Sequence, residues 1–422
     1  MRVRRLLIVT TEPPPTSSGL GTFWAKLCVG AVGSEFAVDF LGPDPDRSSP
    51  FGPSGLPVRY ECVGLGNPPF SRRASVGRNR TSGLRRTCWS GLRAPFALAE
   101  RILHRNFYLE WIVERTERLL PRILTEGRYD SVAVLPPPLE LAVVVRDAAC
   151  TAGVPFIHVV GDPIGHRRAD GSFLPAQVDV QRDLIATASA VFIAEPTHRL
   201  YYSSWFDLPQ SRVVFLSDLF LPRGSVEDRT SPLSVAEDAI LHFGQVSRWR
   251  SIDGLVDAIC ELNSSGDAVG QSRSLVVIGP IEDAASRARA AEKLGHRFKN
   301  PPLLSYLDAR AAALSARQHV VIVSPEHRDN VPSKLIDSLA FGRPILVLCH
   351  PESAAAEIVR DLGVGVVSDV RSTAEILRGL RELRNRFDAL EENYQGNARI
   401  REWNCFVVGA RFKNRLFEVM NW

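Results

Sequence analysis

Acidic, basic and amide side chains gather between residues 324 and 344 at spacings that suit a phosphorylated ligand. A strand is predicted to end at Val323, and Pro332 suits the first turn of a helix. Asp329 lies in the loop before this helix, and Asp337 lies on the helix itself. Because a helix N-terminus carries unpaired N–H groups and a partial positive charge, the segment predicts a diphosphate seat between two carboxylates.

A second set of candidate phosphate ligands follows the strand predicted at residues 239–243. Gly244 comes directly after this strand, and Arg248 and Arg250 follow within the same loop. A guanidinium can hold two phosphate oxygens in a planar fork, which makes both arginines candidate ligands of a diphosphate. The alternative is that both arginines are simply solvated.

The run at residues 332–344 reads P-S-K-L-I-D-S-L-A-F-G-R-P. It resembles the form P-x-K-x-x-E-x-x-A-x-G-K-P of retaining GT-B glycosyltransferases, and the chain is similar to family 4, the glycosyl transferases group 1 type. In that family the first acid of an E-x7-E region approaches the donor sugar, and the second bonds the ribose hydroxyls. The resemblance gives these roles to Asp329 and Asp337, each one methylene shorter than glutamate. A capped helix of an unrelated doubly wound protein is the alternative.

The resemblance also implies a set of donor-binding residues. The 240–255 segment is similar to the family's strand-Gly-Arg-Leu...Lys-Gly segment, whose two cations clamp the donor diphosphate. Arg250 falls at the place of the lysine, whereas Gln245 takes the place of the arginine, for which Arg248 could compensate. The donor-binding residues expected on this basis are Gly19, Gly21, Gly244, Arg248, Arg250, Asn330, Val331, Ser333, Lys334 and Asp337.

In the first half of the chain, residues 135–140 and 153–164 are similar to a subgroup of the same family. That subgroup carries a Pro-Pro segment followed by a D-F-R-D-P-W signature, and Asp162 aligns with its second aspartate while Gly161 replaces its arginine. Asp162 therefore joins Asp329 and Arg250 as an expected catalytic residue. His166, in a loop beside Asp162, is the candidate to face the acceptor, whereas His158 in a predicted strand is interpreted as a core residue.

Two glycines near the N-terminus belong to a loop between a predicted strand at residues 6–9 and a predicted helix at residues 22–32. Gly19 and Gly21 match the glycines of the family's N-terminal loop, where a missing side chain lets the backbone approach phosphate and acceptor. The loop is neither a Walker motif nor a G-x-G-x-x-G fingerprint, which argues against an ATPase and a dehydrogenase.

The expected chemistry needs neither a strong protein base nor a metal. In the family the leaving diphosphate is thought to accept the acceptor's proton, so catalysis by Arg250 and helix-end amides would be mainly electrostatic. The D-x-D at residues 44–46 is bracketed by turn residues and is interpreted as a loop rather than a metal site. We therefore expect metal-independent transfer with no cofactor other than the nucleotide-diphosphate sugar as co-substrate.

Short apolar runs alternate with helical segments along the chain, which predicts doubly wound α/β structure. Turn-forming residues interrupt this pattern near residue 225, and the pattern then restarts. The predicted fold is an α/β GT-B architecture in which two Rossmann-like doubly wound domains face a central cleft. The expected domains are an acceptor-binding domain at residues 1–225, a nucleotide-sugar-binding domain at 226–400 and a C-terminal helix at 401–422 that crosses back to the first domain.

Composition limits the remaining classes of function. A chain of 422 residues favours two domains, and its net charge of +4 is too weak to indicate a nucleic-acid partner. Seven scattered cysteines argue against a disulfide framework and favour a reducing, cytoplasmic compartment. No apolar run reaches the length of a spanning helix. The arginine-rich residues 72–105 fit a peripheral contact with the inner face of the membrane, an anionic acceptor, or a solvated loop.

Together these features predict a hexosyltransferase-type glycosyltransferase. It would move a sugar with retention from a nucleotide-diphosphate sugar to a hydroxyl of a glycan, lipid-linked or small-molecule acceptor, as in polysaccharide biosynthesis or secondary metabolism. A catalytically silent GT-B binding partner would explain the departures at Gln245, Asp329 and Gly161. A nucleotide-sugar 2-epimerase is the third hypothesis, and turnover of the donor separates the three.

Overall fold

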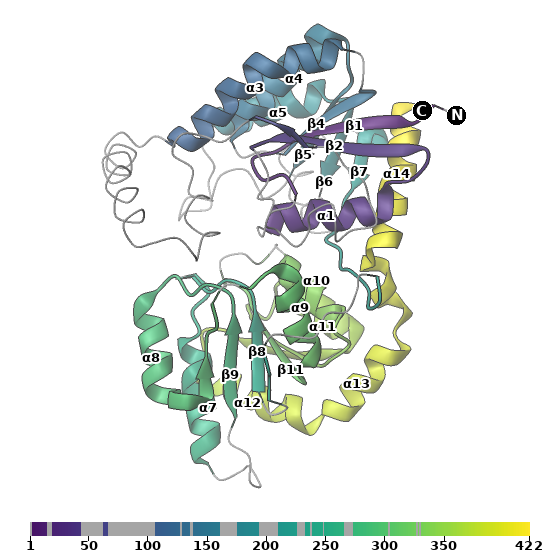
Figure 1. Cartoon of the computed structure of the whole chain (residues 1–422). Helices are drawn as coiled ribbons and strands as arrows, with labels where there is room; N and C mark the ends of the chain where they lie inside the picture. The colour runs from purple at the N-terminus through teal and green to yellow at the C-terminus, as the bar shows by residue number, and fades with distance from the viewer. Residues whose placement is uncertain are drawn as a thin grey trace. The chain divides into compact units, whose positions relative to one another are not determined.

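The structure is a computed structural model of the whole chain (Figure 1). The residues that it describes are 2–14, 19–43, 62–65, 106–126, 129–135, 138–160, 175–193, 210–225, 233–236, 239–247, 249–265, 273–302, 304–325, 328 and 331–422, with no side-chain placement for 19, 20, 62 and 175–177. Residues in this description form two compact units. The first extends to Leu216 and also includes Gly409–Trp422, and the second comprises Ser217–Val408.

Within the described residues, the first unit contains a parallel sheet with the strand order β3-β2-β1-β4-β5-β6-β7. β1 pairs with β2 on one side and with β4 on the other, so the strand order reverses beside β1, as in Rossmann-like folds. Leu6, Leu7, Ile8 and Val9 of β1 are fully buried, which explains their unbroken apolar run. The strands are β1 (Arg4–Val9), β2 (Phe36–Gly42), β3 (Cys62–Gly64), β4 (Ser131–Val134), β5 (Phe156–Val160), β6 (Ala190–Ile193) and β7 (Val213–Phe215).

Helices cover both faces of this sheet (Figure 1). Ile112 and Leu120 of α3 and Val145 of α4 pack into the same buried cluster as Val132 of β4. On the other face, Phe412 of α14 contacts Phe192 of β6 edge-to-face, with ring centroids 4.9 Å apart. The described helices here are α1 (Gly19–Ala31), α3 (Phe107–Thr125), α4 (Leu139–Ala152), α5 (Pro175–Thr187), η2 (Gln210–Arg212) and the larger part of α14 (Cys405–Met420).

The second unit contains a parallel sheet whose described strands have the order β10-β9-β8-β11-β12-β13. β8 pairs with both β9 and β11, so the order reverses beside β8. Open α/β sheets bind ligands outside the carboxyl ends of their strands at such a reversal. The strands are β8 (Ala239–Phe243), β9 (Ser274–Ile278), β10 (Phe298–Lys299), β11 (Gln318–Ile322), β12 (Ile345–Cys349) and β13 (Gly365–Asp369).

Helices α8, α9, α11 and α12 of the second unit begin at side-chain caps that the sequence supplies. Ser353 Oγ accepts a hydrogen bond from Ala356 N, and Ser372 Oγ accepts one from Glu375 N. The described helices are α7 (Asp253–Ser264), α8 (Ala284–Leu294), η3 (Gly295–Arg297), α9 (Tyr306–Ser315), α10 (Ser333–Leu339), α11 (Ala354–Leu362), α12 (Thr373–Asn385), α13 (Phe387–Gly396) and η4 (Ala398–Trp403).

The C-terminal helix α14 begins in the second unit and continues as part of the first. Its residue Gly409 lies so close to α1 that a Cβ atom there would be 2.4 Å from the carbonyl carbon of Gly30. Lys413 Nζ forms an ion pair with Glu35 at 2.5 Å, and Arg415 Nε donates to Val213 O at 3.2 Å. These contacts make the end of α14 an integral part of the first unit.

None of the helices in the part of the chain that the structure describes has the length and hydropathy that a membrane crossing requires.

Candidate functional site

The carboxyl end of β8 is closed by a glycine whose missing side chain makes room for a lysine. Gly244 has a φ of +133°, and a Cβ atom there would lie 3.0 Å from Lys334 Nζ. Its amide donates to Ile278 O at 2.8 Å, which ties the end of β8 to β9. The backbone conformation therefore favours glycine at this position, and a Cβ atom there would displace the end of the Lys334 side chain.

A second glycine repeats this arrangement at the end of β9. Gly279 has a φ of +144°, and a Cβ atom there would lie 2.3 Å from Gly244 O. The two loops are then joined by hydrogen bonds from Val246 N to Pro280 O at 2.9 Å and from Glu282 N to Val246 O at 3.0 Å. Backbone contacts within the second unit thus fix the loop that carries Gln245.

Lys334 reaches this loop from the first turn of α10. Its Nζ donates to Gln245 O at 3.2 Å. Burial and the neighbouring charge of Arg250 lower the pKa of Lys334 to about 7. The ammonium group is therefore disfavoured in the free protein, and an anion placed beside it would restore its charge.

Arg250 and His242 complete a set of basic groups around Lys334. Arg250 forms no ion pair within the described residues, and its backbone N–H donates to Ser247 O at 2.9 Å. Burial and the charge of Lys334 lower the pKa of His242 to about 3, so this fully buried histidine is neutral. Its Nδ1 donates to Val320 O at 3.1 Å, which fixes the ring between β8 and β11. The positive charge at this edge thus comes from Arg250 and Lys334.

A carboxylate lies one turn further along α10. Asp337 is 6% exposed, and its Oδ1 accepts a hydrogen bond from the Tyr306 hydroxyl at 2.9 Å. Burial and the negative charge of Asp337 raise the pKa of Tyr306 well above its usual range, so the phenol remains a donor. Lys334 and Asp337 are three residues apart and lie on neighbouring positions of one helix surface. The short helix α10 thus presents a cation and an acceptor side by side.

Gln245, at the position where the resemblance places an arginine, has a different role from a phosphate ligand. Its Nε2 donates to Glu282 Oε1, and its side chain is exposed. The backbone carbonyl of Gln245, rather than its amide side chain, contacts Lys334.

Of the remaining sequence-predicted residues, four lie in the described part of the chain and the others lie outside it. Val331 packs partly buried against the core cluster that includes Leu335, and Ser333 is the first residue of α10. Gly19 and Gly21 lie inside α1, which begins at Gly19, so the expectation that they belong to a loop before the helix is wrong. The positions outside the described residues are Asp162, His166, Arg248, Asp329, Asn330, Gly161, the D-x-D at 44–46 and the 72–105 stretch.

His158 is a buried residue of β5, in agreement with its interpretation as a core histidine. Its Nε2 lies 2.8 Å from Gln181 Nε2, and burial lowers its pKa to about 4. The amide of Gln181 therefore donates to a neutral imidazole.

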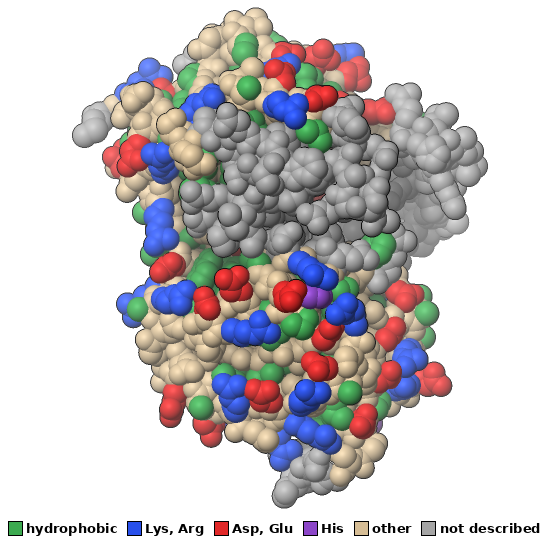
Figure 2. All heavy atoms as spheres, turned by 180° about the vertical axis from the view of Figure 1, so that it is seen from behind, with side chains coloured by type: hydrophobic (Ala, Val, Ile, Leu, Met, Phe, Trp, Pro, Cys, Tyr) green, Lys and Arg blue, Asp and Glu red, His purple; other side chains and the backbone are tan. Residues whose placement is uncertain are grey.

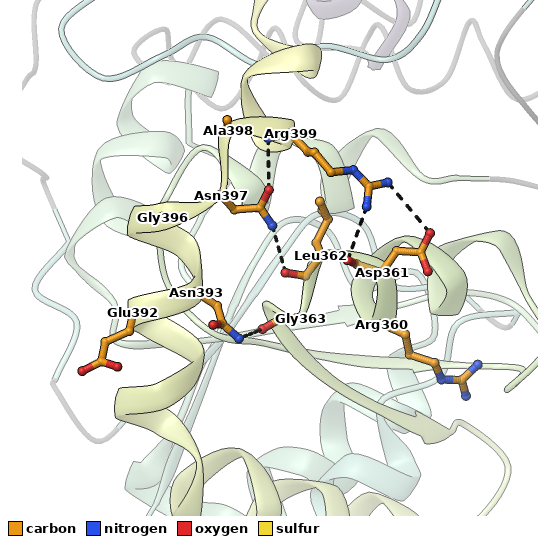
Figure 3. Close-up of a pocket in the computed structure, with 10 residues that line it drawn as sticks. All are labelled: Arg360, Asp361, Leu362, Gly363, Glu392, Asn393, Gly396, Asn397, Ala398 and Arg399. Atoms are coloured by element: carbon orange, nitrogen blue, oxygen red, sulfur yellow. Dashed lines mark hydrogen bonds and ion pairs between the residues drawn. The ribbon is translucent and has the colours of Figure 1, made fainter.

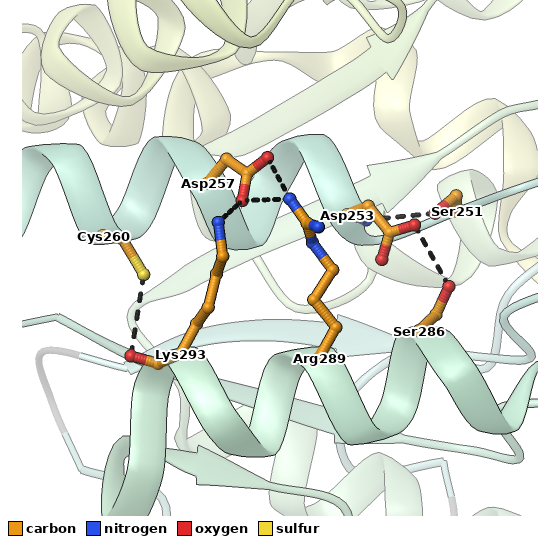
Figure 4. Close-up of polar contacts among 7 residues, drawn as sticks. All are labelled: Ser251, Asp253, Asp257, Cys260, Ser286, Arg289 and Lys293. Atoms are coloured by element: carbon orange, nitrogen blue, oxygen red, sulfur yellow. Dashed lines mark hydrogen bonds and ion pairs between the residues drawn. The ribbon is translucent and has the colours of Figure 1, made fainter.

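Other polar clusters of the second unit have structural roles. In the pocket of Figure 3, Asn393 Nδ2 donates to Gly363 O and Asn397 Nδ2 donates to Leu362 O, each at 2.9 Å, so both amides cap the end of α11. In Figure 4, Asp257 of α7 binds Arg289 and Lys293 of α8, each at 2.7 Å. Acidic and basic side chains also alternate over the face of the second unit in Figure 2.

Metal ligands do not converge in the part of the chain that is described: no group of three or more His, Cys, Asp or Glu side chains is arranged to hold a metal ion.

Comparison with solved structures shows which fold these two units form. The chain is similar to sucrose-phosphate synthase from Thermosynechococcus elongatus, with a TM-score of 0.65 and 14% identity over 99% of this chain and 98% of the other. It is similar to HepE of Anabaena in complex with UDP and glucose, with a TM-score of 0.62 and 11% identity over 98% and 99% of the chains. A putative UDP-N-acetylglucosamine 2-epimerase from Listeria monocytogenes has a TM-score of 0.60 and 11% identity over 98% and 96%.

The chain therefore has the GT-B fold, with two parallel-sheet α/β units. No protein-family model matches the sequence, and neither does any curated protein. At these identities the structural similarity establishes the fold, which glycosyltransferases and an epimerase share.

Proposed function

We propose that the protein is a glycosyltransferase of the hexosyltransferase type that binds a nucleotide-diphosphate sugar at the carboxyl edge of the second sheet. The observation that carries this proposal is the position of Lys334 over Gly244, with Arg250 beside it and Asp337 one turn away. A diphosphate needs cations and a ribose needs an acceptor, and this edge offers both within one loop and one short helix.

Lys334 and Arg250 would bind the diphosphate. Burial lowers the pKa of Lys334, the charge of Arg250 lowers it further, and Arg250 has no ion pair with the described residues. Two like charges held together without an intervening carboxylate gain most from an anionic ligand. The Gln245 carbonyl orients the Lys334 ammonium group, because it accepts one of the three protons of that group.

Asp337 would accept hydrogen bonds from the ribose hydroxyls, as the resemblance implies. A carboxylate can accept about four hydrogen bonds, so the bond from Tyr306 does not by itself prevent Asp337 from binding a diol. The spacing of Lys334 and Asp337 on α10 would then match the order phosphate, ribose and base along a nucleotide.

In the proposed reaction the bond between the anomeric carbon and the diphosphate oxygen breaks, and a bond to the acceptor oxygen forms. The acceptor's proton passes to the departing diphosphate, so atoms and charge balance without a protein base. Arg250 and protonated Lys334 would stabilise the charge that develops on the leaving group. Retention and independence of metal and cofactor belong to the proposal, as do catalytic roles for Asp329 and Asp162.

The acceptor would be a glycan, a lipid-linked saccharide or a small molecule, with His166 beside it. Residues 72–105 would contribute a basic surface for an anionic acceptor or for the inner face of the membrane. A cytoplasmic protein with access to nucleotide sugars and to that membrane face fits these roles, including one in polysaccharide biosynthesis.

One observation favours a second function. The similarity to a putative 2-epimerase covers nearly the whole of both chains, so the fold fits a nucleotide-sugar epimerase as well. A catalytically silent binding partner would share the donor site but turn over nothing. Incubation of the bound donor with candidate acceptors separates the three. Transfer releases a nucleoside diphosphate and leaves the sugar on the acceptor, epimerisation yields an isomeric nucleotide sugar, and a silent partner leaves the donor unchanged.

The experiment that tests donor binding is a thermal-shift screen against UDP, GDP, dTDP and ADP and their common sugar conjugates. A ligand at about 100 times its dissociation constant should stabilise the protein by roughly 2.7 kcal/mol. We expect one nucleotide to shift the wild type, Arg250→Ala to lose the shift and Arg378→Ala to retain it. Arg378 is the matched control because its side chain is 71% exposed on α12. No shift with any nucleotide, or an equal loss in both variants, would overturn the proposal.

A further inference from the structure

A tyrosine that the sequence did not single out lies against the proposed ribose-binding carboxylate. Tyr306 is the first residue of α9, after the N-cap Ser305, whose Oγ accepts a hydrogen bond from Asp308 N at 3.1 Å. The cap fixes the start of the helix and hence the direction of the tyrosine side chain. Its hydroxyl donates to Asp337 Oδ1 at 2.9 Å, from a helix that is distant in sequence from α10.

The ring of Tyr306 also touches the strand end that carries the phosphate-side residues. Its centroid lies 6.1 Å from that of Phe243, at an interplanar angle of 62°. Phe243 is the last residue of β8 and directly precedes Gly244, over which Lys334 lies. The tyrosine therefore packs on β8 with its ring and holds α10 with its hydroxyl.

The chemistry of this pair allows one direction of hydrogen bonding. Burial and the adjacent carboxylate raise the pKa of Tyr306 well above its usual range, so the phenol remains protonated at any physiological pH. The phenol therefore donates and the Asp337 oxygen accepts. The hydroxyl thus holds one oxygen of the carboxylate in place and thereby orients the other oxygen.

We propose that Tyr306 is a positioning residue that sets Asp337 for the ribose diol and thereby gives the site its preference for ribonucleotides over deoxyribonucleotides. The inference rests on the proposed function, because it assumes that Asp337 faces a nucleotide. A site built to pair a substrate hydroxyl discriminates against an analogue that lacks it, because its polar group then loses a partner.

The chain offers a matched control for the loss of one buried phenol. Tyr394 of α13 is 7% exposed, and its hydroxyl has no hydrogen-bond partner in the described structure. Tyr306→Phe and Tyr394→Phe remove the same atom from a ring that keeps its packing. Loss of a phenolic oxygen as such is therefore common to both variants, whereas loss of the hydrogen bond to Asp337 is confined to the first.

The test is calorimetric titration of the wild type and both variants with UDP, GDP and ADP and with their 2′-deoxy forms. For the nucleotide that binds, we expect the wild type to prefer the ribose form by about tenfold or more. Tyr306→Phe should weaken binding of the ribose form about tenfold, so that the ratio of the affinities for the ribose and 2′-deoxy forms comes close to one. Tyr394→Phe should keep this ratio. In an Asp337→Ala background, Tyr306→Phe should have little further effect, because the hydroxyl acts through the carboxylate.

The outcomes distinguish the inference from the proposal beneath it. A wild type that binds none of these nucleotides and no dTDP overturns both, and one that binds dTDP alone overturns the inference. A wild type with ribose preference whose ratio is unchanged by Tyr306→Phe, or lowered equally by Tyr394→Phe, overturns the inference and leaves donor binding intact. If Tyr306→Phe does not fold, Tyr306→His, which keeps a ring N–H donor, should bind the ribose form with partial preference, and loss of all preference in it would contradict the inference.

Discussion

Raising the pH from 6 to 9 should weaken binding of a nucleotide sugar, because the Lys334 ammonium group loses its proton in the free protein within this range. Its pKa is lowered to about 7 by burial and by the charge of Arg250. A bound diphosphate would favour the charged form and raise that pKa again. Binding therefore takes up a proton whenever the free protein holds Lys334 neutral.

The size of the effect follows from the titration of one group. At pH 6 about nine-tenths of Lys334 is protonated in the free protein, at pH 8 about one-tenth, and at pH 9 about one-hundredth. If the bound form stays protonated, the apparent affinity falls by about tenfold between pH 6 and 8 and about tenfold more by pH 9. Each tenfold step is about 1.4 kcal/mol.

Two neighbouring groups of the described residues, His242 and Tyr306, do not titrate in this window. The pKa of His242 is lowered to about 3 by burial and by Lys334, and that of Tyr306 is raised well above 10. A nucleotide sugar is the suitable ligand because its diphosphate is a diester and lacks the second phosphate pKa near about 6 of a monoester.

The assay is calorimetric titration at four pH values in two buffers of different ionisation enthalpy, which reports both affinity and proton uptake. We expect uptake of about half a proton per ligand at pH 7 and almost a full proton at pH 8. Lys334→Arg is the control, since its guanidinium cannot lose a proton and its affinity should be flat with pH. An affinity of the wild type that is independent of pH, or a decline of the same size in Lys334→Arg, would refute this reasoning.

Three further results follow from the same structure. Lys334→Met should abolish nucleotide binding. It should also raise the free energy of unfolding by about 1–2 kcal/mol at pH 6 and by less at pH 9, because the lowered pKa means that folding disfavours the charged lysine. Melting temperatures of the variant and the wild type that are equal at both pH values would contradict this. Gly244→Ala should cost about 1–3 kcal/mol and displace Lys334, so that nucleotide affinity falls, whereas Gly342→Ala, at φ +64° in open space, should lower stability and leave affinity unchanged. Gly409→Ala should lose about 1–3 kcal/mol in denaturant unfolding because of the close contact with α1, and Gly396→Ala, which meets nothing within 4 Å, serves as its control.

Most of the fold could be predicted from the sequence because parallel strands buried on both faces leave unbroken apolar runs. The runs at residues 6–9 and 274–278 coincide with β1 and β9, and the two-unit GT-B architecture follows from their alternation with helices. The two-residue strand β10 was missed because it is too short to show a period. The sequence of residues 373–394 alone predicts one helix, whereas the structure has two, α12 and α13, which meet at Arg386 in a non-helical conformation.

The candidate site could be predicted only where a residue's role depends on its own type. Gly244 and Lys334 stand out because a glycine after a strand and a lysine at a helix start match a known pattern. The φ of Gly244 and its contact with Lys334 depend on how two distant segments meet, as does the hydrogen bond from Tyr306 to Asp337. The side-chain contact of Gln245 with Glu282 likewise joins two loops that no local pattern relates.

We propose above that a nucleotide-diphosphate sugar binds at the carboxyl edge of the second sheet. The most direct test is a crystal structure of the protein with the nucleotide sugar that the thermal-shift screen selects. We predict that diphosphate oxygens lie within hydrogen-bond distance of Lys334 Nζ and that ribose hydroxyls lie within the same distance of Asp337. A nucleotide bound elsewhere on the chain, with Lys334 still donating only to the Gln245 carbonyl, would contradict the claim.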